Sequence, residues 1–117
     1  MSMSADPAVV TVGEEQWEPF YVDGERMGDM HWLRPPSEHA RGPVATVWRV
    51  QPGDAPAEID YRFDGDELWH VLEGAIDVTY EDGRRYTLSA GDIGAFPRGG
   101  HATLRLTTPF KKAYMVA

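Results

Sequence analysis

Glu67 is the residue of this sequence whose type and surroundings best suit chemistry. It lies in a stretch, 61–74, whose side chains alternate with period two, and it shares a face with Trp69 and Val71. Enclosure by apolar side chains raises the pKa of a carboxyl group through desolvation, which suits a general acid or base near neutral pH. We therefore predict Glu67 as the catalytic residue. A structural role, as a buried carboxylate hydrogen-bonded to Tyr61 or to backbone amides, is the alternative.

Aromatic residues near Glu67 are candidates for a ligand pocket. Tyr61 is expected either to hydrogen-bond a substrate or to hold the acid in place. If the strands close into a barrel that is hollow at this level, Phe63 and Trp69 form pocket walls. Otherwise they are core residues.

The last strand-like segment, 110–116, adds two pocket candidates. Strand alternation puts Lys112 and Tyr114 on one face of it. Either side chain could reach the pocket. For Lys112 we favour a surface position in which its aliphatic stem packs over the barrel.

The histidines decide whether a metal site is expected. His70 points away from Glu67 by strand parity. His101 follows a Pro-Arg-Gly-Gly loop and faces outward unless the glycines create a bulge, so it stays a pocket candidate. His31 and His39 have no metal-site spacing and suit surface or hydrogen-bonding roles. We predict no metal cofactor; the alternative is one divalent ion held by Glu67 and His101.

The composition favours a single all-β domain. The chain has 117 residues, and its 9 Pro and 12 Gly leave segments that suit strands better than helices. A net charge of -8 repels phosphate backbones and anionic membranes, so neither nucleic acid nor membrane is an expected partner. The absence of cysteine excludes disulfides and thiolate metal sites. With no apolar run near the ~20 residues of a membrane span and no signal-like start, we expect a cytoplasmic protein.

Turn residues divide the chain into short alternating segments. Pro19 breaks an apolar segment and keeps it from being a central strand. Gly74 is expected to mark a bend. Glu73, just before it, is expected on the same face as Glu67. Asp92 is expected to stabilise a turn through its side chain. The pattern predicts turns at 23–24 and 82–83 and strands at 9–12, 30–34, 44–50, 57–63, 67–73, 76–80, 85–88, 93–96, 102–107 and 110–116.

The succession of strands and turns resembles the cupins, which are small double-stranded β-helix or jelly-roll barrels. Glu67 and Gly74 keep the spacing of the acid and the final glycine in the first cupin motif. Tyr61 and Phe63 stand where that motif has its two histidines. Neither can replace a neutral imidazole, because a phenol must first lose a proton with a pKa near 10 and a phenyl ring cannot ligate.

The second cupin motif is matched in its turn residues. Gly91, Pro97 and Gly99 have the expected spacing, whereas His101 lies one place before the position of the motif histidine. Within the cupins, the chain resembles the branch named after the cupin domain of (S)-ureidoglycine aminohydrolase. The segments that carry this likeness are 47–53, Glu67, Gly91-Asp92, Pro97-x-Gly99 and 109–114.

The resemblance implies one cupin domain over residues 1–117. Residues 1–8 are expected to form a flexible tail or arm, 9–43 strands that pack on the barrel or across a dimer, and 44–117 the barrel core. It implies a small polar metabolite in the barrel and hydrolase, isomerase or lyase activity, with Glu67 as the acid-base group and little or no metal. The alternative is a non-catalytic ligand-binding or sensor cupin. In either case we expect a homodimer.

Overall fold

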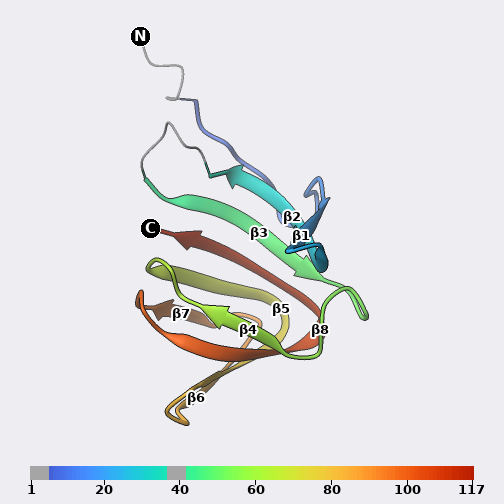
Figure 1. Cartoon of the computed structure of the whole chain (residues 1–117). Coiled ribbons are helices and arrows are strands. Elements are labelled where there is room, and N and C mark those ends of the chain that lie inside the picture. Colours follow the sequence, from blue (N-terminus) through green and yellow to red (C-terminus); the bar gives the residue numbers. More distant parts are fainter. Residues whose placement is uncertain (1–5, 37–41) are drawn as a thin grey trace.

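The short alternating segments fold into an all-β jelly roll, as the sequence predicts. The computed structural model describes residues 6–36 and 42–117, and the strands within these ranges form an eight-stranded sheet (Figure 1). No helix in this described part is long and apolar enough to cross a membrane. The strands are β1 (Glu18–Val22), β2 (Glu25–Arg34), β3 (Val44–Val50), β4 (Ile59–Arg62), β5 (Glu67–Tyr80), β6 (Arg85–Ser89), β7 (Ile93–Phe96) and β8 (His101–Val116).

β8 is the strand that connects the two sides of the barrel. Its C-terminal half pairs with β3 and its N-terminal half pairs with β4, both antiparallel. On the opposite edge, β5 pairs with β8 along nearly its whole length. In Figure 1, the red C-terminal half of β8 accordingly runs between β3 and β5, and its orange N-terminal half runs alongside β4. Side chains on the inner face of β8 therefore have neighbours from strands on both edges.

The predicted strand ends near Gly74 and Pro109 are wrong, because β5 and β8 each continue as one strand. The two positions face each other: a Cβ on Gly74 would lie 2.4 Å from the carbonyl oxygens of both Thr107 and Pro109. The ladder between β5 and β8 shifts register on either side of Glu73. This irregularity accommodates a proline that has no amide hydrogen to donate. It also turns Glu73 to the exposed side, away from the face of Glu67.

The N-terminal strands extend the same sheet. β2 pairs with β3, and β1 pairs with β2 at the sheet edge, where Pro19 is tolerated because an edge strand needs fewer amide donors. The predicted turn at 23–24 joins β1 to β2, with both residues at positive φ. The predicted strand at 9–12 is wrong, since this segment is irregular and Val9 is 87% exposed. Residues 1–5 of the predicted tail lie outside the described residues.

Aromatic rings fill the part of the barrel where β5 and β7 meet. Phe63 is 1% exposed and stacks on Phe96, with ring centroids 5.3 Å apart. Trp69 is fully buried, 4.1 Å from Phe96 and 5.8 Å from Phe63 between centroids. These three residues form the centre of the core.

At the adjoining turn, the Ser89 amide donates to the Asp92 carboxylate at 2.8 Å, which confirms the predicted turn-stabilising role of Asp92.

The approach between Gly74 and β8 predicts a large cost for any side chain at this position. Gly74→Ala would bring a methyl group against two carbonyl oxygens at a residue with φ +73. We expect it to lower the free energy of unfolding by about 3 kcal/mol or more, from clash and backbone strain together. Gly83→Ala is the matched control, because Gly83 also has positive φ but no atom within 4 Å of its built Cβ. It should cost about 1–2 kcal/mol. Equal losses for the two variants in urea denaturation would contradict the prediction.

Candidate functional site

The carboxylate of Glu67 is buried and held by two donors. Glu67 is 4% exposed at the start of β5. The Tyr61 hydroxyl donates to its Oε2 at 2.6 Å, and the Trp69 indole Nε1 donates to its Oε1 at 2.9 Å. Trp69 is available for this bond because a strand returns to the same face after two residues. Both oxygens are therefore satisfied from the protein side.

Tyr61 connects this carboxylate to the interior space of the barrel. Its ring packs edge-on against Phe63, with centroids 5.0 Å apart, and its hydroxyl bonds Glu67. Burial, followed by the charge of Glu67, raises the pKa of Tyr61 far above its ordinary value. Tyr61 thus remains a protonated phenol at all physiological pH values. Its hydroxyl proton is directed at Glu67, and its oxygen lone pairs remain for a ligand.

Lys112 is the second buried charged residue of this region, at 2% exposure. The favoured expectation of a surface position for Lys112 is therefore wrong. Its Nζ lies 3.4 Å from the ring centroid of Trp69, 4.4 Å from that of Tyr114 and 5.2 Å from that of Trp48. Among the described residues, this ammonium contacts the faces of aromatic rings and has no hydrogen-bond acceptor.

Strand register explains how this aromatic cage forms. Lys112 on β8 is paired with Trp48 on β3 and with Val71 on β5. The next inward pair along β8 and β5 is Tyr114 with Trp69. Trp48 was not among the residues that the sequence analysis singled out for the site. The alternation of 44–50 puts Trp48 on one face of a predicted strand, but only the pairing of β3 with β8 brings it next to Lys112.

The cage changes the protonation of its members. Burial lowers the pKa of Lys112 to about 7, while the charge of Glu67 acts in the opposite direction. The pKa of Tyr114 is raised by burial and then by Glu67. Near neutral pH, Lys112 is consequently present both as an ammonium and as a free amine. A buried lysine of this kind suits a nucleophile or a proton donor.

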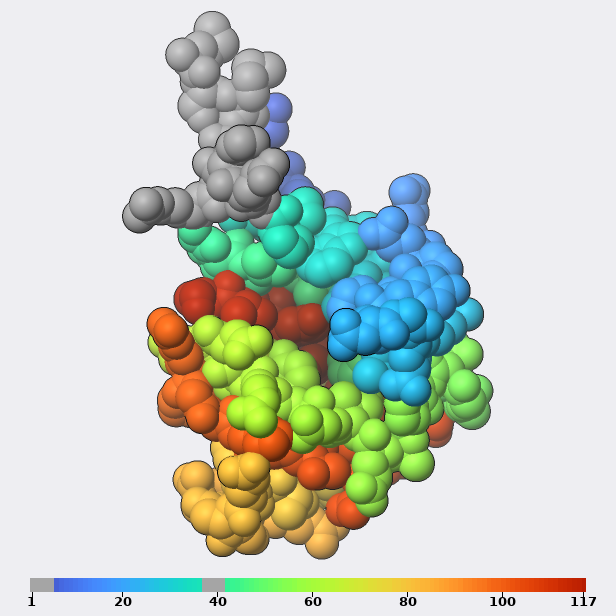
Figure 2. Space-filling view, in the orientation of Figure 1, coloured from blue at the N-terminus to red at the C-terminus, as the bar shows by residue number. Residues whose placement is uncertain are grey.

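Lys112, Tyr61 and Tyr114 line a cavity of about 210 Å³ beneath the N-terminal hairpin. Figure 2 shows the hollow between the blue hairpin of β1 and β2 and the yellow-green β4, with red atoms of β8 at its floor. Apart from Asp60 at the rim, the remaining walls are apolar. They are Phe20 and Val22 of β1, Met27 and Met30 of β2, Trp48 of β3, Ile59 of β4 and Leu104 of β8. The described residues thus enclose a largely apolar space with one polar end.

The cavity does not reach every predicted pocket residue. Tyr61, Lys112 and Tyr114 line it, while Glu67 lies behind Tyr61. Phe63 and Trp69 pack in the adjoining core and are absent from its walls. Trp69 still contributes by bonding Glu67 and by supporting the Lys112 ammonium.

His101 lies on the outer face of β8, away from this cavity. Its strand partner is Arg62, so it points to the side opposite Tyr61. Its ring bonds the carboxylates of Asp60 and Glu81, and the bond to Asp60 is the main cause that raises the pKa of His101. The structure therefore does not bring His101 and Glu67 together for the alternative metal site. It is an outward residue, as strand parity without a bulge requires.

The other histidines do not add to the site. His70 is exposed, on the opposite face from Glu67, as parity predicts. His31 accepts the Gln16 amide at 2.9 Å through Nδ1, which is a hydrogen-bonding role of the kind expected. His39 lies outside the described residues.

The residues of this cavity do not fit the metal centre that metal-using cupins hold. At the motif positions stand Tyr61, whose proton is retained, and Phe63, which has no donor atom. The Lys112 ammonium occupies the region near Glu67 and repels a cation. Within residues 6–36 and 42–117, no group of three or more metal-ligating side chains is close enough together to hold an ion.

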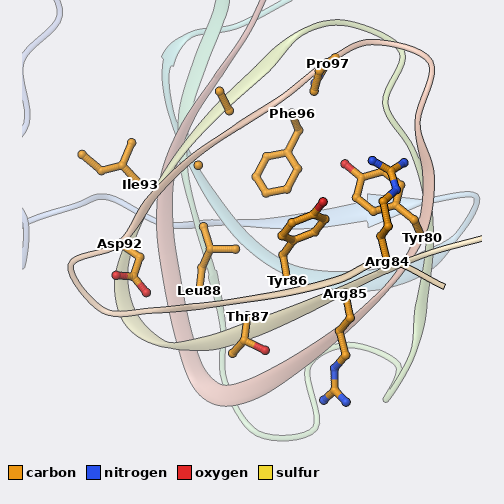
Figure 3. Close-up of a pocket in the computed structure, with 12 residues that line it drawn as sticks. Tyr80, Arg84, Arg85, Tyr86, Thr87, Leu88, Asp92, Ile93, Phe96 and Pro97 are labelled. Atoms are coloured by element: carbon orange, nitrogen blue, oxygen red, sulfur yellow. The ribbon is translucent and has the colours of Figure 1, made fainter. Parts of the chain in front are cut away.

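A larger outer groove, of about 640 Å³, lies over β6 and β7 (Figure 3). Tyr80, Tyr86 and Phe96 face it together with Arg84, whereas the Arg85 side chain at its edge points away from these rings. Both arginines already have carboxylate partners, Asp82 at 2.7 Å and Asp77 at 3.1 Å. The groove is an open surface hollow with solvated ion pairs, so we place the candidate site in the smaller cavity.

Comparisons with known proteins support the cupin resemblance. Residues 38–114 match the profile described as the EutQ-like cupin domain. A DUF861 family protein from Thermotoga maritima is 31% identical, with a TM-score of 0.54 over 61% of this chain and 76% of its own. A putative ethanolamine utilization protein Q from Salmonella typhimurium is 17% identical, with a TM-score of 0.59 over 88% of this chain and 94% of its own, which shows the fold alone. A search of curated proteins finds no significant match.

Burial of Lys112 predicts that the protein becomes more stable as the pH rises above neutrality. Folding lowers the pKa of Lys112 from 10.5 to about 7, so between these values unfolding takes up a proton. The free energy of unfolding should rise by about 2 kcal/mol between pH 7 and pH 9. Lys112→Met should lack this rise in urea denaturation, whereas Lys111→Met, the matched control, should keep it. A rise of the same size in wild type and Lys112→Met would contradict the assignment.

Proposed function

The chain belongs to the EutQ-like cupin family, and we propose that its barrel binds a small ligand with an apolar body and one polar, oxygen-bearing group. The observation that carries this proposal is the cavity of about 210 Å³ with Lys112, Tyr61 and Tyr114 at one end. Pockets for drug-sized ligands usually measure about 300–1,000 Å³, so the ligand of this cavity must be smaller than a drug-sized molecule.

The charges at the polar end favour a neutral ligand group. Lys112 supplies a positive charge when protonated, and Glu67 behind Tyr61 supplies a negative one. A carboxylate on the ligand would be repelled by Glu67, and a cation on the ligand would be repelled by protonated Lys112. A carbonyl or hydroxyl oxygen can accept from Lys112 and Tyr114 without either repulsion. Because the walls are apolar, a ligand with a short hydrocarbon body suits the cavity better than the small polar metabolite that the resemblance implies.

The proposed chemistry is proton transfer, in the hydrolase, isomerase or lyase classes. Tyr61 lines the cavity and Glu67 bonds its hydroxyl at 2.6 Å, so the acid-base role predicted for Glu67 would operate through Tyr61. A ligand-binding or sensor cupin without turnover is the alternative function. The finer likeness to the (S)-ureidoglycine aminohydrolase branch stays a prediction, since fold alone does not specify a reaction.

We also propose that the protein is a cytoplasmic homodimer. β1 forms one edge of the sheet and leaves Tyr21 59% and Val22 41% exposed. An edge strand with exposed apolar side chains is a surface on which a second strand can pair. Sedimentation velocity at micromolar concentration should show a dimer, and a monomer would refute this proposal.

Ligand binding can be tested with butanone, butyrate and butylammonium, which share a short alkyl body and differ in charge. Trp48 lines the cavity and Trp69 contacts Lys112, so tryptophan fluorescence should report binding. We expect saturable binding of butanone and weaker binding of both ions. Lys112→Met should weaken butanone binding by about tenfold or more, through loss of a charged hydrogen bond.

Two matched substitutions test whether butanone binds in the cavity. Ile59→Phe fills space inside it, whereas Ile93→Phe makes the same change in the outer groove. The first should abolish the butanone response and the second should leave it intact. Butanone binding that survives Ile59→Phe, or that is lost equally in both variants, would refute the proposed site.

A further inference from the structure

We propose that Lys112 forms an imine with a small aldehyde or ketone bound in the barrel cavity. This inference rests on the proposed function, because the carbonyl compound must occupy the same cavity. It adds the substrate class and a covalent role for one residue.

The position of the Lys112 amine is the first argument. Lys112 lines the cavity and is 2% exposed. Its Nζ lies against the faces of Trp69, Tyr114 and Trp48 and has no recorded hydrogen-bond acceptor among the described residues. A buried amine without an acceptor is free to use its lone pair or its protons on a ligand. The group needing such a partner is a carbonyl at the polar end of the cavity.

The protonation of Lys112 is the second argument. Only the neutral amine attacks a carbonyl, and a lysine with an ordinary pKa is neutral in fewer than about one in a thousand molecules at pH 7. Burial lowers the pKa of Lys112 to about 7, so about half of the molecules carry the free amine there. Desolvation in an apolar pocket is a known way to activate a lysine nucleophile.

The step balances without any further reagent. The amine nitrogen attacks the carbonyl carbon, and one nitrogen proton passes to the carbonyl oxygen to give a carbinolamine. The hydroxyl group then leaves with the second nitrogen proton as water, and the C=N bond forms. Tyr61, whose hydroxyl lies 2.6 Å from the Glu67 carboxylate, is the cavity-lining group that can carry these protons. No oxidant or reductant takes part.

Lys111 provides an internal control, because Lys111 and Lys112 are the two lysines of the 117-residue sequence. Strand alternation turns Lys111 to the other face of β8. There its Nζ lies 3.1 Å from the Glu15 carboxylate and 5.5 Å from the Trp17 ring centroid. The two lysines are therefore adjacent in the sequence, but their amines have different surroundings.

The test is reductive trapping of the imine with butanal and sodium cyanoborohydride at pH 7. Hydride transfer to the C=N carbon gives a stable butyl-lysine, which peptide mass mapping assigns to Lys111 or Lys112. We expect Lys112 to be modified at least tenfold faster than Lys111 in the wild-type protein. Adduct formation at this site should disappear in Lys112→Arg and persist in Lys111→Arg. Equal rates at the two lysines, or no adduct at Lys112, would overturn the inference.

The same variants separate this inference from the proposed function. Ile59→Phe should block trapping and Ile93→Phe should not, provided that both give wild-type near-ultraviolet circular dichroism. If butanone binds in a Lys112-dependent way but butanal gives no adduct at Lys112, the binding function stands and the imine is refuted. If butanone does not bind, the proposed function fails as well. The comparison of Lys111 with Lys112 in one wild-type molecule does not depend on any variant folding.

Discussion

The pairing of β8 with β3 on one edge and with β5 on the other is the constraint on which the cavity depends. It places Lys112 beside Trp48, and Tyr114 beside Trp69. A slip of β8 by one residue would exchange its two faces and turn Lys111 inward in place of Lys112. The apolar residues Phe110 and Leu104 on the inner face of β8 oppose such a slip, because both are almost fully buried. The register that forms the core thus also positions the amine.

The absence of the motif histidines alters the shape of the barrel interior as well as its chemistry. Phe63 stands at one histidine position and stacks on Phe96, so an aromatic ring takes the place of a metal-ligating imidazole. The remaining cavity lies toward the N-terminal hairpin, whose Phe20 and Met27 form part of its wall. The Trp48 indole donates to the Met27 carbonyl at 2.6 Å and holds this hairpin in place. The barrel core predicted at 44–117 is therefore insufficient to form the cavity.

The sequence was sufficient for the fold and for part of the site. Spacing identified the cupin motifs, and alternation identified the inner face of β4 and the placement of Glu67 beside Tyr61. Alternation also placed Lys112 and Tyr114 on one face, but it did not show how deeply Lys112 is buried. That depth comes from Trp48, which is distant in the sequence and becomes a neighbour only through the β3–β8 pairing. Strand ends failed at Gly74 and Pro109 because breaker residues can face each other within a continuous ladder.

Glu67 and Lys112, the two buried charged residues beside the cavity, have different partners, which points to a division of roles. Glu67 receives two hydrogen bonds, from Tyr61 and Trp69, which compensate much of the cost of removing a carboxylate from water. Lys112 has aromatic faces, which compensate less, typically by about 0.5–2 kcal/mol. The charge of Glu67 still favours the protonated form of Lys112. Glu67 is thus the better compensated of the two residues, and Lys112 is the one whose surroundings the proposed ligand would change most. A residue left under-compensated in the apo protein gains most when a ligand arrives, which makes the lysine, rather than the acid, the centre of this site.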